Sequence, residues 1–353
     1  MGKERVAVVG IGQTKHEATR GDVSVAGLLR EAAGRALADA EMTWADVDAV
    51  VIGKAPDFFE GVMMPELFLA DALGCTGKPM FRVHTAGSVG GSTAIVASQL
   101  ISAGIHERVL TVAFEKQSES EAMWALSLPI PFTPPLHAGA GGYFAPHIRS
   151  YIRRAKAPDH IGMLVALKDR QNGLKNPYAH LHEHDISFDS IKESMMLWDP
   201  IRYDETCPSS DGAAAMVIGD EAAADARVAD GHPVAWINAT ALRTEPLAYA
   251  GRDQVNPQAS RDAAAALWRA QGAGETLRPM DETDTVNQQI VYAPYESALF
   301  WVQPIVLLNP IDVGDVGHLS PENPNRQSGA ITAPFRKRGI AVLIPTFRGE
   351  SGN

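Results

Sequence analysis

A hydroxyl side chain stands where a nucleophile could act in the stretch VHTAGSVGGSTAIVASQLISAG, residues 83–104. The stretch reads as a strand end, a glycine-rich turn and a helix, and Ser88 lies where that helix begins. A catalytic serine needs an adjacent base to take its proton. Ser88 also has glycine on one side only, unlike the serine of a Gly-x-Ser-x-Gly nucleophile elbow. Because serine is a favoured N-cap residue, the pattern favours a helix cap or a hydroxyl that lines a site.

Two histidines could line the same site. His84 lies four residues before Ser88 at the predicted strand end, although a hydrogen-bonded core histidine would fit the same pattern. His137 lies in PPLHAGAGGYFAP, where the glycines would let backbone N–H groups approach a ligand closely. This segment has no phosphate-loop pattern, so we expect it to form a lid or a wall of a pocket.

A basic cluster lies in RSYIRRAKAPDHIGMLVALKDRQNGLK, residues 149–175. Its cations are Arg149, Arg153, Arg154, Lys156, Lys168, Arg170 and Lys175. Guanidinium and ammonium groups can hold phosphates by charge-assisted hydrogen bonds. The alternative is an ordinary solvated helix face.

Three histidines alternate in AHLHEHD, at His180, His182 and His184, and such spacing can hold a metal ion. Asn176 and Pro177 form a turn signal just before them. We therefore expect a solvated loop and no metal site here.

The hydrophobic pattern predicts the elements that must position these side chains. Residues 6–12 and 45–53 read as strands, and residues 24–40 between them read as a helix. The apolar face of that helix holds Leu28, Leu29, Ala32, Ala33 and Leu37. This strand–helix–strand order predicts a parallel sheet covered by helices.

The same order recurs in the second half, with a strand at 233–242, a helix at 260–272 and an echo of the second strand at 281–292. The repeat predicts an internal duplication whose two halves build two sheets that share helices between them. Residues 309–353 are poorly patterned, and only 339–347 read as a strand.

Residues 115–200 interrupt the first half with prolines, a glycine cluster and two helix-like stretches. Insertions of this length are usually functional. Residues 211–219 then return to an apolar strand of the first half. The predicted division is a first half made of 1–114 and 201–230, a loop domain at 115–200, and a second half at 231–353.

Composition excludes several classes of protein. The chain has 353 residues, 45% hydrophobic and 21% charged, as in a globular protein large enough for two cores. A formal net charge of −11 argues against a nucleic-acid partner. Two cysteines cannot form a disulfide framework, the first residues lack a signal-peptide pattern, and the longest apolar run is too short to span a bilayer. These features predict a cytoplasmic protein with no membrane span.

A set of segments in a fixed order carries a family resemblance. The set consists of FRVHTAGSVGGSTAI, LVALKDRQNGLKNPYAHL, MLWDPIRYDETCPSSDGAAAMVI and GRDQVNP, together with the duplicated halves. From residue 4 to about 295 the chain resembles the thiolase superfamily, and within it the sterol-carrier-protein-type thiolases called lipid-transfer proteins. Beyond that point it lacks the asparagine- and glycine-rich turn and the Gly-His-Pro-like loop of such proteins. This departure implies either a divergent C-terminal part or a site that has lost some of its residues.

The resemblance implies a duplicated, five-layered α/β/α/β/α fold with an inserted loop domain, a tight dimer and acyl-CoA substrates. It implies no bound cofactor, because coenzyme A would enter as part of the substrate. It places Ser88 at the position of the nucleophilic cysteine of thiolases. It also favours the basic stretch, with Arg149, Arg153, Arg154 and Lys168, and the glycine-rich segment with His137, as the wall that binds coenzyme A.

Two tyrosines take positions that the resemblance makes functional. It aligns YAPY with a His-Asp-x-Phe-like stretch, with Tyr292 at the histidine and Tyr295 at the aromatic residue. A lipid-transfer-like branch with tyrosine at that histidine position resembles retro-aldolases rather than thiolases. Tyrosine can act as an acid or base when its surroundings shift its pKa from about 10. Otherwise Tyr292 is an aromatic residue that packs at a strand end.

These features lead to three hypotheses. The first is a carbon–carbon lyase that cleaves a bulky, branched 3-hydroxyacyl-CoA, such as one with a steroid side chain, together with a small OB-fold, zinc-ribbon partner. The second is a thiolase-type acyltransferase. The third is a non-catalytic carrier of acyl-CoA or lipid, or a scaffold for an active paralogue. Under each hypothesis we expect a dimer whose interface includes the apolar strand at 79–87. The edge of a parallel sheet that carries such apolar residues must be covered by another surface.

Overall fold

The computed structural model describes residues 4–54, 64–85, 88–119, 139–246, 253, 255–270, 288–292 and 296–303. The strands are β1 (Val6–Gln13), β2 (Ala49–Gly53), β3 (Met80–Val83), β4 (Arg108–Lys116), β5 (Met196–Trp198), β6 (Ile201–Arg202), β7 (Asp211–Asp220), β8 (Ala235–Thr244), β9 (Gln288–Tyr292) and β10 (Glu296–Gln303). The α-helices are α1 (Val25–Asp39), α2 (Glu66–Ala72), α3 (Val89–Ser102), α5 (Gly139–Ala155), α6 (Ile161–Gly173), α7 (Phe188–Glu193), α8 (Glu221–Ala229) and α9 (Gln258–Ala270). Strands and helices alternate, so the predicted α/β class is confirmed.

The main sheet has the strand order β3-β2-β4-β7-β1-β8-β10-β9. Strands β2, β3 and β4 run parallel, whereas β7 pairs antiparallel with both β4 and β1. The prediction of a parallel sheet is therefore wrong for β7. The chain leaves β4 at the carboxyl edge of the sheet, where the parallel strands end, and passes through α5, α6 and α7. It enters β7 at that same edge, so β7 must run antiparallel to β4.

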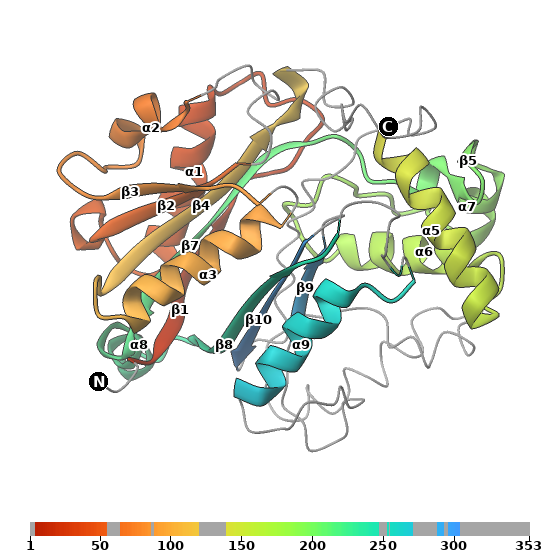
Figure 1. Ribbon diagram of the computed structural model, residues 1–353. Coiled ribbons are helices and arrows are strands. Elements are labelled where there is room, and N and C mark those ends of the chain that lie inside the picture. The colour runs from red at the N-terminus through yellow and green to blue at the C-terminus, as the bar shows by residue number, and fades with distance from the viewer. Residues whose placement is uncertain are drawn as a thin grey trace.

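The two halves are joined by hydrogen bonds, in contrast to the two separate sheets that the repeat predicts. Strand β8 pairs with β1 at only two positions, Ala7 with Trp236 and Val8 with Ala235. Beyond this joint, β8, β10 and β9 form an antiparallel group of their own. Hydrogen bonds join all the strands of the main sheet, but this sheet has two parts (Figure 1). The first part consists of β3, β2, β4, β7 and β1, and the second of β8, β10 and β9.

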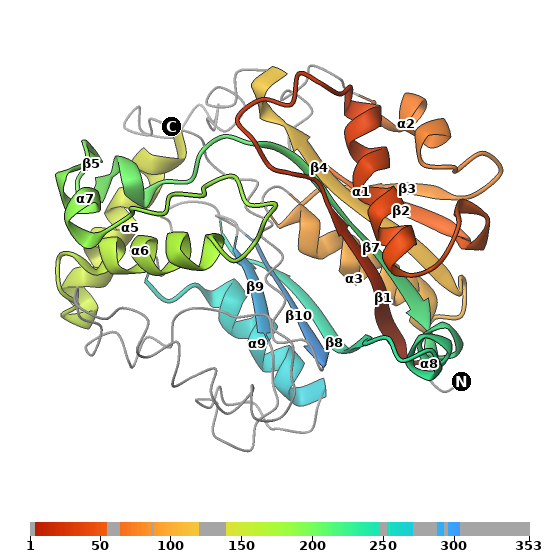
Figure 2. The same ribbon diagram turned by 180° about the vertical axis from the view of Figure 1, so that it is seen from behind.

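Helices cover both faces of the first part of the sheet (Figures 1 and 2). On one face α1 packs against Val50 and Ile52 of β2, and its buried residues include all five that the sequence predicts. On the other face α3 packs against the alternate residues Ala49 and Val51. Helix α3 also contacts β8 and β10, while α9 packs on the β8 part through Ala241 and Leu267. Helix α3 therefore lies between the two parts of the sheet.

The inserted region forms its own group of helices, α5, α6 and α7, with the small β5–β6 hairpin beside them (Figure 1). Other elements match the sequence within a few residues, except that a 3-10 helix at 44–46 delays the start of β2 to Ala49. Of the predicted 281–292 strand, the structure describes only 288–292, and the predicted 339–347 strand lies outside the described residues. The proposed domain boundaries stay a prediction. Among the described residues, no helix is both long and apolar enough to cross a bilayer.

Candidate functional site

The carboxyl edge of the first part of the sheet brings together several residues that could do chemistry. Parallel strands β2, β3 and β4 end there and lead to Lys54, Thr85 and Lys116. Strand β7 begins at the same edge with Asp211, because it runs antiparallel to β4. In open α/β sheets ligands bind outside the carboxyl ends of the strands, so this edge is the candidate site.

Ser88 lies at this edge as the N-cap residue of α3 and is fully buried. Its hydroxyl donates to the carbonyl oxygen of Thr85 at 2.7 Å and lies 3.0 Å from Thr85 Oγ1. Its side chain makes no capping bond to the helix, and its backbone angles (φ −85°, ψ 3°) differ from the extended cap of Ser24 on α1. Ser88 therefore takes the predicted cap position without a side-chain capping bond, and its hydroxyl donates back to Thr85 instead.

Two further hydroxyls, which the sequence did not single out, surround Ser88. Thr85 Oγ1 donates to Ser92 Oγ at 2.6 Å, and Ser92 Oγ donates to the Ser88 carbonyl oxygen at 3.1 Å. A carbonyl oxygen cannot take the Ser88 proton as a catalytic base would. The geometry thus suits a hydroxyl that fixes the turn.

The backbone at the start of α3 offers another kind of chemistry. The first intrahelical bond from this end runs from the Ser92 amide to the Ser88 carbonyl at 3.0 Å. The preceding helical residues, Val89, Gly90 and Gly91, are buried, and their amides have no helical carbonyl to bond. Such amides, at the positive end of the helix dipole, stabilise negative charge on an oxygen. This end of α3 can therefore serve an anion without any nucleophile.

The other predicted catalytic residues are only partly described. His84 follows β3 at the carboxyl edge, with an exposed side chain, so it is not a core histidine. Tyr292 is the last residue of β9, where it pairs with Ser297 of β10, and the structure describes its backbone only. Tyr295 and His137 lie outside the described residues.

The carboxyl edge also holds a buried ion pair that the sequence did not lead us to expect. Lys54 Nζ lies 3.5 Å from Glu115 Oε2, and the two side chains are 1% and 9% exposed. Buried charges persist in proteins when they are paired. The signal in the sequence was a charge directly after an apolar strand (Lys54) and another within one (Glu115).

The predicted coenzyme A cluster divides into paired and exposed cations. Asp199 accepts from Arg149 Nε at 2.9 Å, and this hydrogen bond raises the pKa of Arg149. Asp253, in the segment before α9, accepts from Arg154 at 2.5 Å, which lowers the pKa of Asp253 to about 2. Arg153 is exposed on α5, and Lys168 is half-buried on α6. Carboxylates thus compete with any phosphate for Arg149 and Arg154, whereas Arg153 faces solvent.

The alternating histidines lie in a loop, as their sequence predicts, but two of them are more buried than a solvated loop implies. His180 Nδ1 lies 2.7 Å from Ser210 Oγ, and His182 Nε2 lies 2.5 Å from the Asn176 carbonyl oxygen. Both side chains are partly buried, while His184 is exposed. Within the described part of the chain, no group of three or more acidic, histidine or cysteine side chains is arranged to hold a metal ion.

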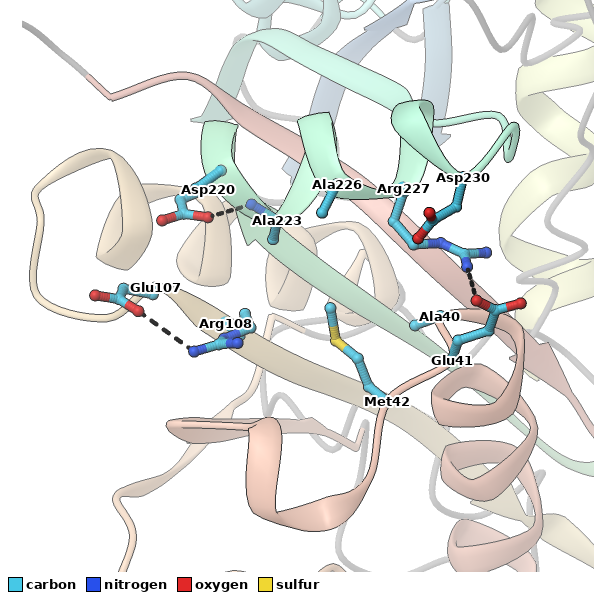
Figure 3. A pocket seen from close by; sticks show the side chains of 11 residues that line it. Ala40, Glu41, Met42, Glu107, Arg108, Asp220, Ala223, Ala226, Arg227 and Asp230 are labelled. Carbon is cyan, nitrogen blue, oxygen red and sulfur yellow. Dashed lines mark hydrogen bonds and ion pairs between the residues drawn. The ribbon is translucent and has the colours of Figure 1, made fainter.

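A pocket of about 430 Å³ lies at the opposite, amino edge of the sheet, between the end of α1, the start of β4 and α8 (Figure 3). Its two arginines face glutamates: Arg227 Nη1 lies 3.2 Å from Glu41 Oε2, and Arg108 Nη2 lies 3.4 Å from Glu107 Oε2. Because Arg108 begins β4, this pocket is far along the strands from the start of α3. It is separate from the candidate site.

Comparison with curated proteins finds relatives, although no family model matches the chain. Sterol carrier protein 2 of Rattus norvegicus is 28% identical in an alignment 238 residues long that covers 62% of this chain. The chain spans 42% of the length of that protein. The acetyl-CoA acetyltransferase of Methanothermobacter thermautotrophicus is also 28% identical, over 60% of this chain and 56% of its own length.

Solved structures show the same fold. The Ltp2-ChsH2(DUF35) aldolase superposes with a TM-score of 0.64 at 23% identity, over 79% of this chain and 71% of that one. Human mitochondrial 3-ketoacyl-CoA thiolase superposes with a TM-score of 0.57 at 16% identity, over 77% of each chain. The predicted thiolase-type α/β fold is thereby confirmed. In sequence the chain is thus similar to proteins of the sterol-carrier-protein type and to an acetyl-CoA acetyltransferase, and its fold is that of the thiolase structures.

Proposed function

We propose that this chain is an acyl-CoA enzyme that cleaves a carbon–carbon bond of a bulky, branched 3-hydroxyacyl-CoA, such as one with a steroid side chain. The observation that carries the proposal is the start of α3. The family resemblance puts Ser88 at the position of the thiolase cysteine, and its hydroxyl donates to the carbonyl oxygen of Thr85, which is not a catalytic base. The helix amides that would stabilise an oxyanion are still in place.

A retro-aldol reaction matches these parts because it needs no covalent acyl-enzyme. A base removes the proton of the 3-hydroxyl group, a carbonyl forms at C3, and the bond between C2 and C3 breaks. The electron pair of that bond passes into the thioester as an enolate, which takes a proton at C2 and leaves as a shorter acyl-CoA. The products are a ketone or aldehyde and that acyl-CoA, so no co-substrate is consumed.

In this proposal the amides of residues 89–91 hold the thioester oxygen as the enolate forms, because they lie at the positive end of α3. Tyr292 is the general base, with Tyr295 and His84 lining the same site. Support for Tyr292 comes from its alignment with the catalytic histidine position of the family, and from its place at the end of β9.

Coenzyme A enters as part of the substrate and lies against the loop domain. Arg153 is proposed to hold its 3′-phosphate, because its side chain is exposed on α5 while Arg149 and Arg154 are held by Asp199 and Asp253. Lys168 and His137 complete the proposed wall. No resident cofactor is required.

We also propose a homodimer that works with a small OB-fold, zinc-ribbon partner. The name of the Ltp2-ChsH2(DUF35) aldolase describes a complex with a DUF35 protein, and its fold resembles that of this chain. This likeness supports the search for a partner of that kind.

The experiment incubates the purified chain, with and without such a partner, with a branched 3-hydroxyacyl-CoA. Release of one ketone or aldehyde and one short acyl-CoA per substrate, without free coenzyme A as a reactant, is the expected result. A strict requirement for free coenzyme A would instead support the acyltransferase, a candidate that the relationship to an acetyl-CoA acetyltransferase favours. Substrate binding without turnover in any combination would support a carrier or a scaffold.

A further inference from the structure

The first turn of α3 contains two consecutive glycines, Gly90 and Gly91, and both are buried. Glycine loses more conformational freedom on folding than any other residue, so it weakens a helix that contains it. The proposed function needs the amides of this turn to point at one oxygen atom, because a misplacement of about 1 Å can lower a rate by about 10²-fold. The turn therefore needs restraints beyond helix propensity.

The first restraint is a pair of hydrogen bonds from Ser92 to the carbonyl oxygen of Ser88. The Ser92 amide donates to this oxygen at 3.0 Å, and the buried Ser92 hydroxyl donates to it at 3.1 Å. Because a peptide unit is planar and trans, its N–H points opposite to its C=O. Bonds that fix the Ser88 oxygen therefore also fix the Val89 amide, which points out of the start of the helix.

The second restraint is the hydroxyl of Thr93, which is 1% exposed. Thr93 Oγ1 donates to the Gly90 carbonyl oxygen at 2.6 Å, and by the same planarity this bond fixes the Gly91 amide. The methyl group of Thr93 packs on β2, since a Cβ atom added to Gly53 would lie 2.5 Å from Thr93 Cγ2. Contact with the sheet thus holds the side chain in the rotamer that makes this bond.

Thr85, which precedes the helix, directs the hydroxyl of Ser92. Thr85 Oγ1 donates to Ser92 Oγ at 2.6 Å, which leaves the single proton of the Ser92 hydroxyl for the Ser88 carbonyl oxygen. The Thr85 carbonyl oxygen in turn accepts from the amide and the hydroxyl of Ser88, at 3.1 Å and 2.7 Å. These bonds join the turn before α3 to the first turn of the helix.

We infer that Ser92 and Thr93 are positioning residues of the site, whose hydroxyls hold the amides of Val89 and Gly91 on the thioester oxygen as it becomes an enolate. The inference rests on the proposed function, because it concerns how the oxyanion amides of that reaction are held. Each hydroxyl acts through a carbonyl oxygen of the same helix and needs no contact with the substrate. Donors held in this way stabilise a developing charge without having to reorganise.

The test compares Ser92→Ala and Thr93→Val with Ser98→Ala. Ser98 Oγ donates to the Ala94 carbonyl oxygen at 2.6 Å, so the control loses the same kind of bond further along α3. Such bonds contribute little to helix stability, and we expect all three variants to fold. Given an active wild type, kcat for a branched 3-hydroxyacyl-CoA should fall roughly 10–100-fold in Ser92→Ala and in Thr93→Val, with KM nearly unchanged. Ser98→Ala should turn over this substrate like the wild type.

Thr93→Ser separates the hydroxyl from the packing of the methyl group. It keeps the donor to Gly90 and should retain most of the activity that Thr93→Val loses. Two results would overturn the inference: turnover in Ser92→Ala and Thr93→Val as high as in Ser98→Ala, or equal losses in Thr93→Ser and Thr93→Val.

An inactive wild type would reject the proposed function, and hydrogen exchange of the native chain would then decide the inference by itself. The Ser92 amide reports on the first turn, because its bond to Ser88 exists only while that turn is formed. Its exchange, corrected for the intrinsic rate of each sequence, should be severalfold faster in Ser92→Ala and Thr93→Val than in Ser98→Ala. Equal exchange in the three variants would show that the hydroxyls do not hold the turn and would overturn the inference.

Discussion

At the scale of single residues, the main prediction concerns two hydroxyls that stand at the proposed site. Tyr292→Phe keeps the ring and removes only the ionisable group, so turnover of a 3-hydroxyacyl-CoA should fall by roughly 10²–10⁴-fold with little change in substrate affinity. Ser88→Ala removes the buried bond to Thr85 and should cost about 0.5–1.5 kcal/mol of unfolding free energy, with a modest loss of turnover. The measurements are kcat with the partner present and denaturant unfolding.

The two variants also act as controls for each other, because each removes one oxygen. An inactive Ser88→Ala beside a nearly normal Tyr292→Phe would reverse the assignment. It would indicate covalent acyl transfer through Ser88.

A second residue prediction separates exposed from paired arginines on α5. Arg153→Ala should weaken the binding of coenzyme A more than that of dephospho-coenzyme A, because it removes a cation proposed to hold the 3′-phosphate. Arg149→Ala is the matched control: its guanidinium is already bonded to Asp199, so both ligands should bind as before. Calorimetry with the two ligands measures the difference. Equal losses for both ligands in Arg153→Ala would exclude a role in reading the 3′-phosphate.

At the scale of elements, the position of α3 depends on its close approach to β2. A Cβ atom at Gly53 would lie 2.5 Å from Thr93 Cγ2 and 3.1 Å from Val89 Cγ2, both in the first turns of α3. Gly53→Ala should therefore destabilise the fold by about 1–3 kcal/mol through overpacking. It should also lower turnover, because the amides at the start of α3 would shift.

Gly34→Ala, in α1, is the control for that change. An added Cβ there meets nothing within 4 Å, so the variant should be stabilised by about 0.5–1 kcal/mol through helix propensity. Urea unfolding of both variants gives the comparison. Similar stability for Gly53→Ala and the wild type would mean that α3 can move away from β2 at no cost.

At the scale of the whole molecule, the edge strand β3 is flanked by apolar side chains on both faces. Phe81, which pairs with Val51 and so lies on the α3 face, is 41% exposed. Leu67 and Phe68 of α2, on the α1 face, are 74% and 44% exposed. Among the described strands β3 is the last on its side of the sheet. A strand edge between two apolar surfaces is typical of an interface, and pairing with a second copy would cover it.

This arrangement leads to a prediction about assembly. The wild type should sediment as a dimer at micromolar concentration, and Phe81→Glu should sediment as a monomer because it places a charge in the interface. Ile105→Glu changes a residue that is 61% exposed between α3 and β4, away from the edge, and should remain a dimer. A monomeric wild type would contradict the prediction.

The sequence alone determined what depends on local order and on the period of apolar residues. The face of α1, the buried strands β1 and β7, and the start of a helix beside Ser88 follow from side-chain spacing, since burial of one face selects the helix or strand that presents it. The order of segments also identified the thiolase-type fold.

Only the tertiary structure decided which polar groups meet, because these contacts join residues far apart in the chain. The direction of β7 and the contact of His16 with the segment of His180 depend on where the inserted region returns to the sheet. The pairing of Lys54 with Glu115 depends on β2 lying beside β4. Ser88 shows the limit of local reasoning most clearly. Its type and place at a helix start predicted a cap or a site-lining hydroxyl. It does take the N-cap position, but its hydroxyl bonds the carbonyl oxygen of Thr85 and makes no capping bond to the helix.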